Sequence, residues 1–293
     1  MRILVTGRGG QVATSIEERA PEGHELLFVD RPEFDLADPA SIARVVEEFR
    51  PDIVLSTAAY TAVDKAEDEP ELAMAVNAIG PGALAEAAKR AGAPIIHLST
   101  DYVFDGTLDR PYREDDATGP IGVYGKTKLA GEEAVRAAGG DHAIVRTAWV
   151  YSPFGANFVK TMLRFGAERE ELTVVADQIG GPTSALDIAD ALFAMIAAWQ
   201  AKGAWSGGVY HFTGSGEASW AEFARAIFAE SAALGGPHAA VRDIATADWP
   251  TKAARPANSR LDCSRFAETF GFRAPAWQDS LQDVVRRLVT PDA

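Results

Sequence analysis

The chain has 293 residues, of which 47% are hydrophobic and 24% charged, and its formal net charge is -14. This is the balance of a globular protein that buries one large core or two smaller ones. The acidic surplus argues against a nucleic-acid-binding surface, which needs a basic footprint. No apolar run approaches the roughly 20 residues of a bilayer span, and the N-terminal residues lack a secretory pattern. We therefore expect a soluble, cytoplasmic protein with neither a membrane nor a nucleic acid as partner.

The ligand-forming side chains give no sign of a metal centre. The single cysteine, Cys263, excludes an intramolecular disulfide and a thiolate cluster. We interpret it as structural rather than nucleophilic. Five scattered histidines show no metal-ligand spacing, and the adjacent acids Glu17 and Glu18 fit a solvated helix face. We expect no metal to be required for the chemistry.

A strand, a glycine-rich turn and a helix open the chain. The apolar residues 3–5 predict a short strand, which runs into the turn TGRGGQVA and a helical pattern up to residue 20. That context favours a dinucleotide site over a plain strand-to-helix turn. Gly7 permits the tight turn, and Gly10 lets the backbone approach a pyrophosphate at the positive end of the helix. Ala13 stands where a third glycine often stands and still allows close packing.

The second predicted strand, residues 25–30, ends in an acid that bears on the cofactor. Asp30 lies about twenty residues beyond the glycines, where a carboxylate holds a ribose 2′-hydroxyl. Arg31 follows it and Arg8 lies in the glycine turn, and either arginine suits a 2′-phosphate. The cofactor is therefore NADPH or NADH, with NADPH slightly favoured.

Further strand and helix units follow in succession. We predict a helix over 39–49, a strand over 51–56, a small-residue loop over 57–61, a long helix over 71–91 interrupted at residues 80–82, and a strand over 94–98. Such a series predicts an α/β fold with a Rossmann-type doubly wound parallel sheet. Ligands of these sheets bind outside the carboxyl ends of the strands. Gly7, Asp30, Tyr60 and Thr100 converge at that edge.

After residue 151 the predicted elements become shorter and mixed. They are helices over 157–168, 186–200 and 220–234 and strands over 172–175 and 209–212, with the apolar helix 186–200 docking on the sheet. We expect residues 1–151 to form the dinucleotide-binding domain. Residues 152–293 would form mainly a smaller mixed α/β substrate-binding lobe, with some segments returning to the Rossmann domain.

Tyr124 and Lys128 form a candidate acid. Four residues apart on a predicted helix, they share one face. A free tyrosine has a pKa of about 10, and a nearby ammonium lowers it towards the range of general acid catalysis. With Thr100 at the end of its strand, the three side chains would surround a carbonyl that receives a hydride from a nicotinamide. The alternative is a solvated helix that happens to carry a Tyr and a Lys.

These motifs resemble the extended short-chain dehydrogenase/reductase superfamily. More narrowly, the chain is similar to the dTDP-4-dehydrorhamnose reductase family. The narrower resemblance rests on blocks that cover nearly the full length: residues 59–67, 99–106, 124–132, 146–151, 157–158, 177–183 and 255–259. It implies NAD(P)H-dependent reduction of the C4 ketone of a dTDP-4-keto-6-deoxysugar by a monomer or homodimer. Some relatives bind Mg²⁺ between subunits.

The resemblance also implies roles for particular residues. Cofactor contacts fall on Gly10, Gln11, Val12, Asp30, Asp35, Leu36, Ala59, Tyr60 and Thr61, in addition to Gly7 of the turn. Catalytic roles fall on Thr100, Tyr124 and Lys128, of which the latter two also meet the cofactor. Asp101 and Trp149 would hold the sugar, together with Thr100 and Tyr124. A strand-end core aromatic is the alternative for Trp149. Arg255 could meet the diphosphate or be a plain surface arginine.

Three rival functions fit parts of the same pattern. One is a reductase of another dTDP-4-keto-6-deoxysugar, since sugar stereochemistry depends on the shape of the pocket. A second is an epimerase or dehydratase of the superfamily, which keeps its cofactor bound and shows no net redox change. The third is a non-catalytic nucleotide-binding regulatory homologue, which would be expected to lack the Tyr or Lys that this chain has.

Overall fold

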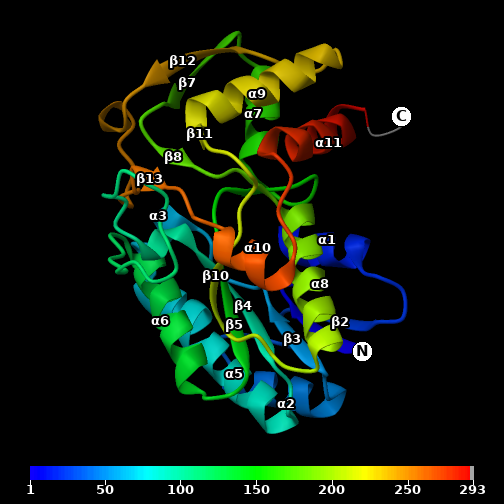
Figure 1. Cartoon of the computed structure of the whole chain (residues 1–293). Helices are drawn as coiled ribbons and strands as arrows, with labels where there is room; N and C mark the ends of the chain where they lie inside the picture. The colour runs from blue at the N-terminus through cyan, green and yellow to red at the C-terminus, as the bar shows by residue number, and fades with distance from the viewer. Residues whose placement is uncertain (291–293) are drawn as a thin grey trace.

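The computed structural model describes residues 1–290 and consists of a larger and a smaller lobe (Figure 1). The larger lobe is built on a six-stranded parallel sheet in the order β2-β1-β3-β4-β5-β10. Its strands are β1 (Arg2–Thr6), β2 (Glu25–Val29), β3 (Ile53–Ser56), β4 (Ile95–Thr100), β5 (His142–Thr147) and β10 (Gly208–His211). The predicted doubly wound α/β fold is confirmed. The strand order reverses at β1, so the crevice beyond β1 and β3 is the switch point where ligands bind.

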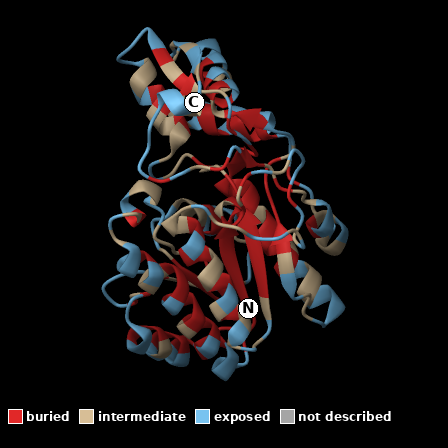
Figure 2. Ribbon diagram, turned by 90° about the vertical axis from the view of Figure 1, so that its left-hand side faces the viewer, coloured by how far each residue is buried: buried red, intermediate tan, exposed pale blue. Residues whose placement is uncertain are grey.

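Helices cover both faces of this sheet, and its inner strands β1, β3, β4 and β5 are largely buried between them (Figure 2). One face carries α1 (Gln11–Arg19), α8 (Ala185–Lys202) and α10 (Ser264–Phe270); the other carries α2 (Pro39–Phe49), α5 (Gly80–Ala91) and α6 (Val123–Ala137). Side chains alternate between the faces, as the two-residue period of a strand requires. Leu55 and Leu98 pack on the α8 side, whereas Val54 and Ile95 pack on the α5 side. The apolar helix predicted over 186–200 therefore docks on the sheet as expected.

The helical stretch before β4 differs from the prediction. It runs without a break through α4 (Pro70–Met74), a π-helical turn (Ala75–Ile79) and α5, so the expected interruption at residues 80–82 was wrong. Gly80 is the first residue of α5. A larger residue would not fit there, because its Cβ would collide with the Leu36 carbonyl oxygen. A Cβ on Gly82 would lie 2.9 Å from the Ala134 Cβ. These glycines allow close packing rather than ending a helix.

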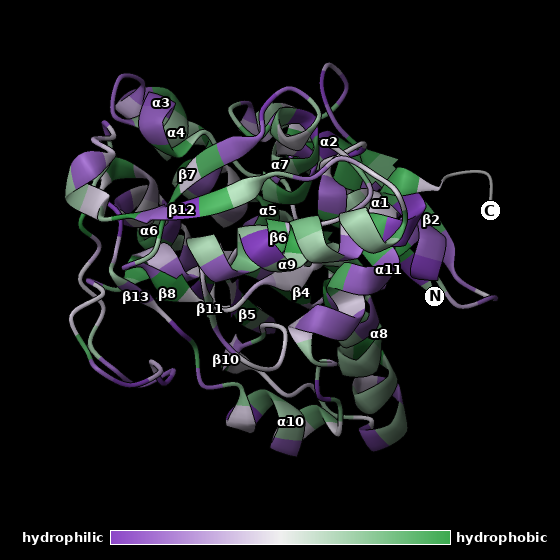
Figure 3. Ribbon diagram, turned by 90° about the horizontal axis from the view of Figure 1, so that it is seen from above, coloured by the Kyte–Doolittle hydropathy of each residue, from purple (hydrophilic) through white to green (hydrophobic). Residues whose placement is uncertain are grey.

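The smaller lobe combines three helices with short strands. Its helices are α7 (Phe158–Gly166), α9 (Trp220–Ala233) and α11 (Trp277–Val289), beside the parallel pair β7 (Glu171–Val175) and β12 (Ala240–Ile244). Seen from above, β7 and β12 run side by side across this lobe (Figure 3). Phe223, Ile227, Leu281 and Val284 form its core, and each such buried side chain contributes about 1.5–3 kcal/mol.

Short elements complete the two lobes. They are α3 (Val63–Ala66), the 3₁₀ turns η2 (Asp101–Val103) and η3 (Thr246–Asp248), and the strands β6 (Val150–Tyr151), β8 (Ile179–Gly180), β9 (Thr183–Ser184), β11 (Ala218–Ser219) and β13 (Asn258–Ser259). The sequence did not predict these strands or α11. Within residues 1–290 no helix combines the length and apolarity that a membrane crossing requires.

Candidate active site

A cavity of about 500 Å³ opens at the carboxyl ends of β1 and β3. The residues lining it include the predicted site residues Gly7, Gly10, Gln11, Val12, Asp30, Ala59, Thr61, Tyr124 and Lys128. Arg8, Arg31 and Thr147 also line it, and so do Gly155 and Ala156, from the segment that leads into α7. The glycine turn and the Tyr-Lys helix, more than a hundred residues apart in sequence, therefore share one cavity.

The glycine turn is held close to the loop after β3. Thr6 Oγ1 accepts the backbone N–H groups of Thr57 and Ala58, each at 3.0 Å. Gly7 has φ +88°, and a Cβ on it would lie 3.1 Å from the Ala58 Cα, so both conformation and space favour glycine. Gly10 is the N-cap of α1 and supplies no side-chain cap. The first amides of α1 are thus open to an anion, and the cradle fits a dinucleotide pyrophosphate.

Gln11 connects this turn to the second half of the chain. Its Oε1 accepts hydrogen bonds from Ser152 Oγ at 2.9 Å and from Asn157 Nδ2 at 3.0 Å. Asn157 in turn caps α7 by accepting the N–H of Lys160. The wall of the cavity is therefore built jointly by α1 and the segment that leads into α7.

Three residues predicted to contact the cofactor lie outside the cavity lining. Leu36 is buried in the core beneath α5, and Asp35 Oδ1 accepts the N–H of Ala37. The Tyr60 hydroxyl donates to Glu69 Oε2 at 2.7 Å, and the Tyr60 backbone is held on both sides by the Asn77 amide. Asp30, in contrast, lines the cavity, as do Arg8 and Arg31.

The start of α6 sets the position of Tyr124. The Val123 N–H donates to Glu67 Oε1 at 2.8 Å. Gly125 has no room for a Cβ, which would collide with the Tyr102 carbonyl oxygen. The helix therefore packs directly against η2, and the Tyr124 ring meets the Tyr102 ring edge-on with centroids 5.6 Å apart. This contact brings the phenol beside Thr100 at the end of β4.

The pKa of Tyr124 differs from the sequence expectation. Burial, followed by the nearby Asp101 carboxylate, raises this pKa to about 12, while hydrogen bonding with Thr100 opposes the rise. A lowered value was predicted from the neighbouring ammonium, and that prediction is wrong for this arrangement. Lys128 Nζ donates instead to the Leu98 carbonyl at 2.7 Å and lies 3.3 Å from His97 Nε2. Burial lowers the pKa of Lys128 to about 8, with Glu132 opposing.

Thr100 and Asp101 form a buried polar pair at the end of β4. Thr100 Oγ1 donates to Asp101 Oδ1 at 2.9 Å and accepts the Tyr102 N–H at 3.2 Å. Burial raises the pKa of Asp101 to about 6, although hydrogen bonds from Ser259 and Thr100 lower it. Asp101 is only 3% exposed, and Thr100 and Asp101 both lie outside the cavity lining.

The two remaining predicted sugar contacts already have partners. Trp149, with φ +49°, stacks on Trp220 with centroids 3.6 Å apart. The Arg255 guanidinium pairs with Asp64, with Nη2 2.6 Å from Oδ2. Sequence reasoning gave no signal for Trp220 or Asp64 as these partners, because both contacts join segments distant in the chain.

Sequence reasoning also missed a buried ion-pair network beneath the site. The Glu132 carboxylate accepts hydrogen bonds from Ser99 Oγ at 2.7 Å, from Arg146 Nε and Nη2 at 2.8 and 2.7 Å, and from Arg136 Nη2 at 2.8 Å. Burial raises the pKa of Glu132, but Arg146 and Ser99 outweigh it, so the net pKa is below its usual value. The network fastens α6 to β4 and β5. The only signal in the sequence was that Glu132 and Arg146 carry opposite charges and lie in blocks of the family resemblance, 124–132 and 146–151.

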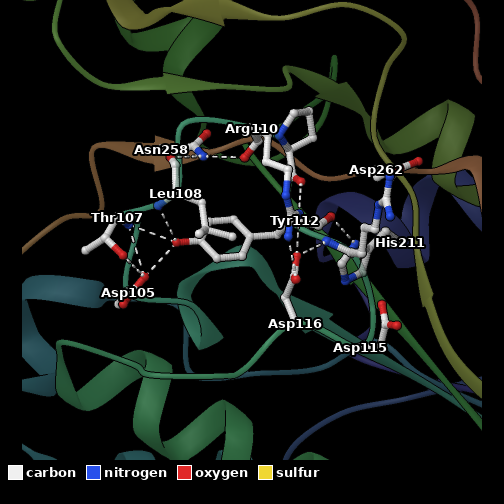
Figure 4. Close-up of polar contacts among 12 residues, drawn as sticks. Asp105, Thr107, Leu108, Arg110, Tyr112, Asp115, Asp116, His211, Asn258 and Asp262 are labelled. Carbon is white, nitrogen blue, oxygen red and sulfur yellow. Dashed lines mark hydrogen bonds and ion pairs between the residues drawn. The ribbon is translucent and has the colours of Figure 1, made fainter.

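The loop between β4 and α6 is fixed by its own polar contacts (Figure 4). The Tyr112 hydroxyl donates to Asp105 Oδ1 at 2.6 Å and accepts the Thr107 N–H at 2.9 Å. Asn258 Nδ2, from β13, donates to the Leu108 and Arg110 carbonyls at 2.8 Å each. The segment that joins Thr100 to Tyr124 is thus attached to the C-terminal half of the chain.

Comparison with known proteins identifies the family. Residues 1–290 match the family described as RmlD substrate binding domain. A dTDP-4-dehydrorhamnose reductase of Sinorhizobium fredii is 50% identical over 290 residues, which cover 99% of this chain and 98% of the relative. The chain belongs to the dTDP-4-dehydrorhamnose reductase family.

Solved structures of the family have the same fold. The reductase of Clostridium acetobutylicum superposes with a TM-score of 0.91 at 38% identity, covering 98% of this chain and 99% of its own. The Bacillus anthracis reductase, solved in complex with NADP, gives a TM-score of 0.89 at 37% identity, covering 97% of this chain and 98% of its own. Among residues 1–290, no group of three or more His, Cys, Asp or Glu side chains is placed to hold a metal ion.

Proposed function

We propose that this chain reduces the C4 ketone of dTDP-4-dehydro-L-rhamnose to give dTDP-L-rhamnose, with NADPH or NADH as reductant. The observation that carries the proposal is that Tyr124 and Lys128 line the same cavity as the glycine turn and Asp30. Family membership supplies the substrate class. A bound reduced nicotinamide supplies the hydride, and the residues of the chain supply position, charge and a proton.

Tyr124 is the proton donor in this proposal. With a pKa of about 12 it is fully protonated at neutral pH, so it carries the proton that the developing C4 alkoxide needs. Lys128 places an ammonium near the same oxygen and stabilises negative charge there. Thr100 turns its hydroxyl from Asp101 to the substrate oxygen, which leaves the buried Asp101 carboxyl to accept a sugar hydroxyl. All three donors would then face the oxygen on which negative charge develops.

Cofactor preference depends on the charged residues that line the cavity. Arg8, Asp30 and Arg31 are all among them, and Asp30 Oδ1 already accepts the Arg31 N–H at 2.8 Å. Two guanidinium groups suit a 2′-phosphate better than one carboxylate suits a 2′-hydroxyl. The Bacillus anthracis relative in complex with NADP supports the same choice. We therefore favour NADPH over NADH.

The remaining assignments extend the same proposal. Trp149, stacked on Trp220, would present an aromatic wall to the sugar, and Arg255 would meet the diphosphate while paired with Asp64. Residues 1–151 would bind the dinucleotide, and residues 152–293 mainly the sugar. We expect a monomer or homodimer that works in the cytoplasm without nucleic acid as partner and without a metal requirement.

The decisive test is the loss of absorbance at 340 nm when purified protein is mixed with dTDP-4-keto-L-rhamnose, with NADPH and NADH in separate reactions. Rapid oxidation supports the proposal, and the ratio of the two rates measures cofactor preference. Protein that binds NADPH but oxidises neither cofactor contradicts it. Other dTDP-4-keto-6-deoxysugars then distinguish a sister reductase from a non-catalytic homologue.

A further inference from the structure

Ser56 and His97 are polar side chains on the face that the sheet presents to α5 and α6. Ser56 ends β3 and His97 lies directly opposite it in β4. Earlier in the same strands, this face is built from Val54 and Ile95. His97 is 0% exposed and Ser56 1% exposed. A histidine in such a place loses hydration and packs less well than an aliphatic residue, so its hydrogen bonds must account for its presence.

The hydrogen bonds of His97 determine which ring nitrogen carries the proton. Nε2 lies 3.3 Å from Lys128 Nζ, and Nδ1 lies 3.0 Å from Ser56 Oγ. An ammonium can only donate, so Nε2 must be the acceptor. Nδ1 then carries the proton and donates to Ser56 Oγ. The ring is neutral, since burial and the Lys128 charge hold its pKa well below the usual value.

We propose that His97 is a positioning residue for Lys128, oriented by Ser56. The proposal rests on the proposed function, in which Lys128 serves the reduction. An ammonium has three N–H groups on a flexible stem. The Leu98 carbonyl and His97 Nε2 take two of them, which leaves the third for the cavity that Lys128 lines. Two fixed acceptors behind Nζ thus aim the remaining donor at the ligand.

A purely structural histidine would give different behaviour. If His97 only filled space, its loss would lower thermal stability and leave the chemistry of Lys128 unchanged. If it positions Lys128, its loss removes an acceptor from a buried cation, which disfavours the ammonium and lowers the pKa of Lys128. In a plot of kcat against pH, the alkaline limb is the part in which activity falls as the ammonium loses its proton. Loss of His97 would then move this limb to lower pH.

Other titratable groups around Lys128 also contribute to the pH profile. Those on the elements packed around Lys128 include Tyr124 and Glu132 on α6, Asp101 and Tyr102 on η2, Glu67 after α3, and Arg146 on β5, and Glu132 opposes the lowering of the Lys128 pKa. Glu132 is held ionised by Arg146. None of these groups is changed by a substitution at His97.

The test compares four single variants with the wild type. His97→Leu removes the acceptor. His97→Gln restores one, because the glutamine Oε1 falls close to the position of Nε2. Ser56→Ala frees the ring to adopt the other tautomer. His211→Leu is the matched control, since His211 is also 0% exposed on a strand of the same sheet but bonds the Tyr112 carbonyl instead. For each, kcat against pH, the Kd for NADPH and Tm are measured.

We expect His97→Leu to lower kcat about ten- to a hundredfold and to move the alkaline limb down by about one pH unit. His97→Gln should recover most of the kcat and the wild-type limb. Ser56→Ala should lose several-fold in kcat with a smaller shift of the limb. His211→Leu should lower Tm with the limb unchanged.

Other results overturn the inference. The inference is refuted if the alkaline limb of His97→Leu equals that of the wild type. It is also refuted if His97→Leu and His211→Leu lose the same Tm and His97→Leu loses no more kcat than His211→Leu. If His97→Leu does not fold, Ser56→Ala decides, and a wild-type kcat and limb in that variant refute the proposal. If the wild type binds NADPH without turning over, the proposed function fails separately. In that case, a several-fold higher Kd for NADPH in His97→Leu but not in His211→Leu would still support the inference that His97 positions Lys128.

Discussion

The Glu132→Gln variant tests whether the buried ion pair beneath the site supports the fold. Glu132 is fully buried and accepts four hydrogen bonds from Ser99, Arg136 and Arg146. The amide keeps the shape of the side chain but loses its charge and turns one acceptor into a donor. Arg146, itself 2% exposed, would then keep a buried positive charge without a counter-ion.

The size of the expected stability loss follows from the uncompensated charge of Arg146. Breaking a buried pair by removing one partner costs about 3–5 kcal/mol. Unfolding entropy is about 2.1 cal/mol/K per residue, so 293 residues give roughly 0.6 kcal/mol/K. We therefore expect the Tm of Glu132→Gln to fall by about 5–8 °C.

Thermal unfolding followed by circular dichroism measures this loss. Glu133→Gln is the matched control, because it makes the same chemical change one residue along, at an exposed position. Surface changes of this kind usually stay within about 0.5 kcal/mol. A Tm of Glu132→Gln within 2 °C of the control, on the order of one kcal/mol, would refute the reasoning about the buried pair.

The same pair also makes a pH prediction with a definite sign. The folded-state pKa of Glu132 lies below its usual value, so its contribution to stability is fully present above the unfolded-state pKa of about 4.3. That contribution is lost as the pH falls through the lower, folded-state pKa. The difference in Tm between the wild type and Glu132→Gln should therefore be constant near neutrality and narrow below about pH 4. A difference that widens in acid would contradict this account.

Three further substitutions test the site. Tyr124→Phe should cut kcat by about 10²–10⁴-fold and change the Kd for NADPH by less than about twofold, because only the donated proton is removed; unchanged turnover would rule out Tyr124 as the acid. Arg31→Ala should raise the KM for NADPH by about tenfold and leave that for NADH unaltered, and equal effects on both cofactors would exclude a 2′-phosphate contact. Gly125→Ala puts a Cβ against the Tyr102 carbonyl oxygen, so it should lose about 1–3 kcal/mol and much of the kcat; a wild-type Tm would show that α6 can move away from η2.

The central sheet was predictable because its strands carry local signals. Buried parallel strands are short apolar runs, and the glycine turn after Val5 and the acid at Asp30 mark where two of them end. The continuous helix through residues 70–91 was mispredicted. Gly80 was interpreted by its intrinsic propensity, whereas its role is set by Leu36, which is distant in the sequence.

The predicted site residues likewise fall into those that a local sequence pattern places and those that it does not. Gly7 and Gly10 act through local backbone geometry, so the strand–turn–helix pattern was enough to place them at the cavity. Asp35 and Leu36 were assigned by resemblance alone, and nothing local determines which face of their loop meets a ligand. In the structure Leu36 belongs to the core beneath α5. Short strands such as β8 and β13 pair only two residues each, too few for a periodic signal.

Tyr124 shows why spacing alone cannot give a pKa. Residues four apart on a helix share a face, and that much of the prediction holds for Tyr124 and Lys128. The pKa of the phenol depends on every group around it, and here burial and Asp101 raise it, while the ammonium is bonded to Leu98 and faces His97. In the reaction proposed above, a phenol with a pKa of about 12 keeps its proton at neutral pH until hydride transfer generates an alkoxide beside it. The proposed acid is therefore still protonated when the substrate arrives.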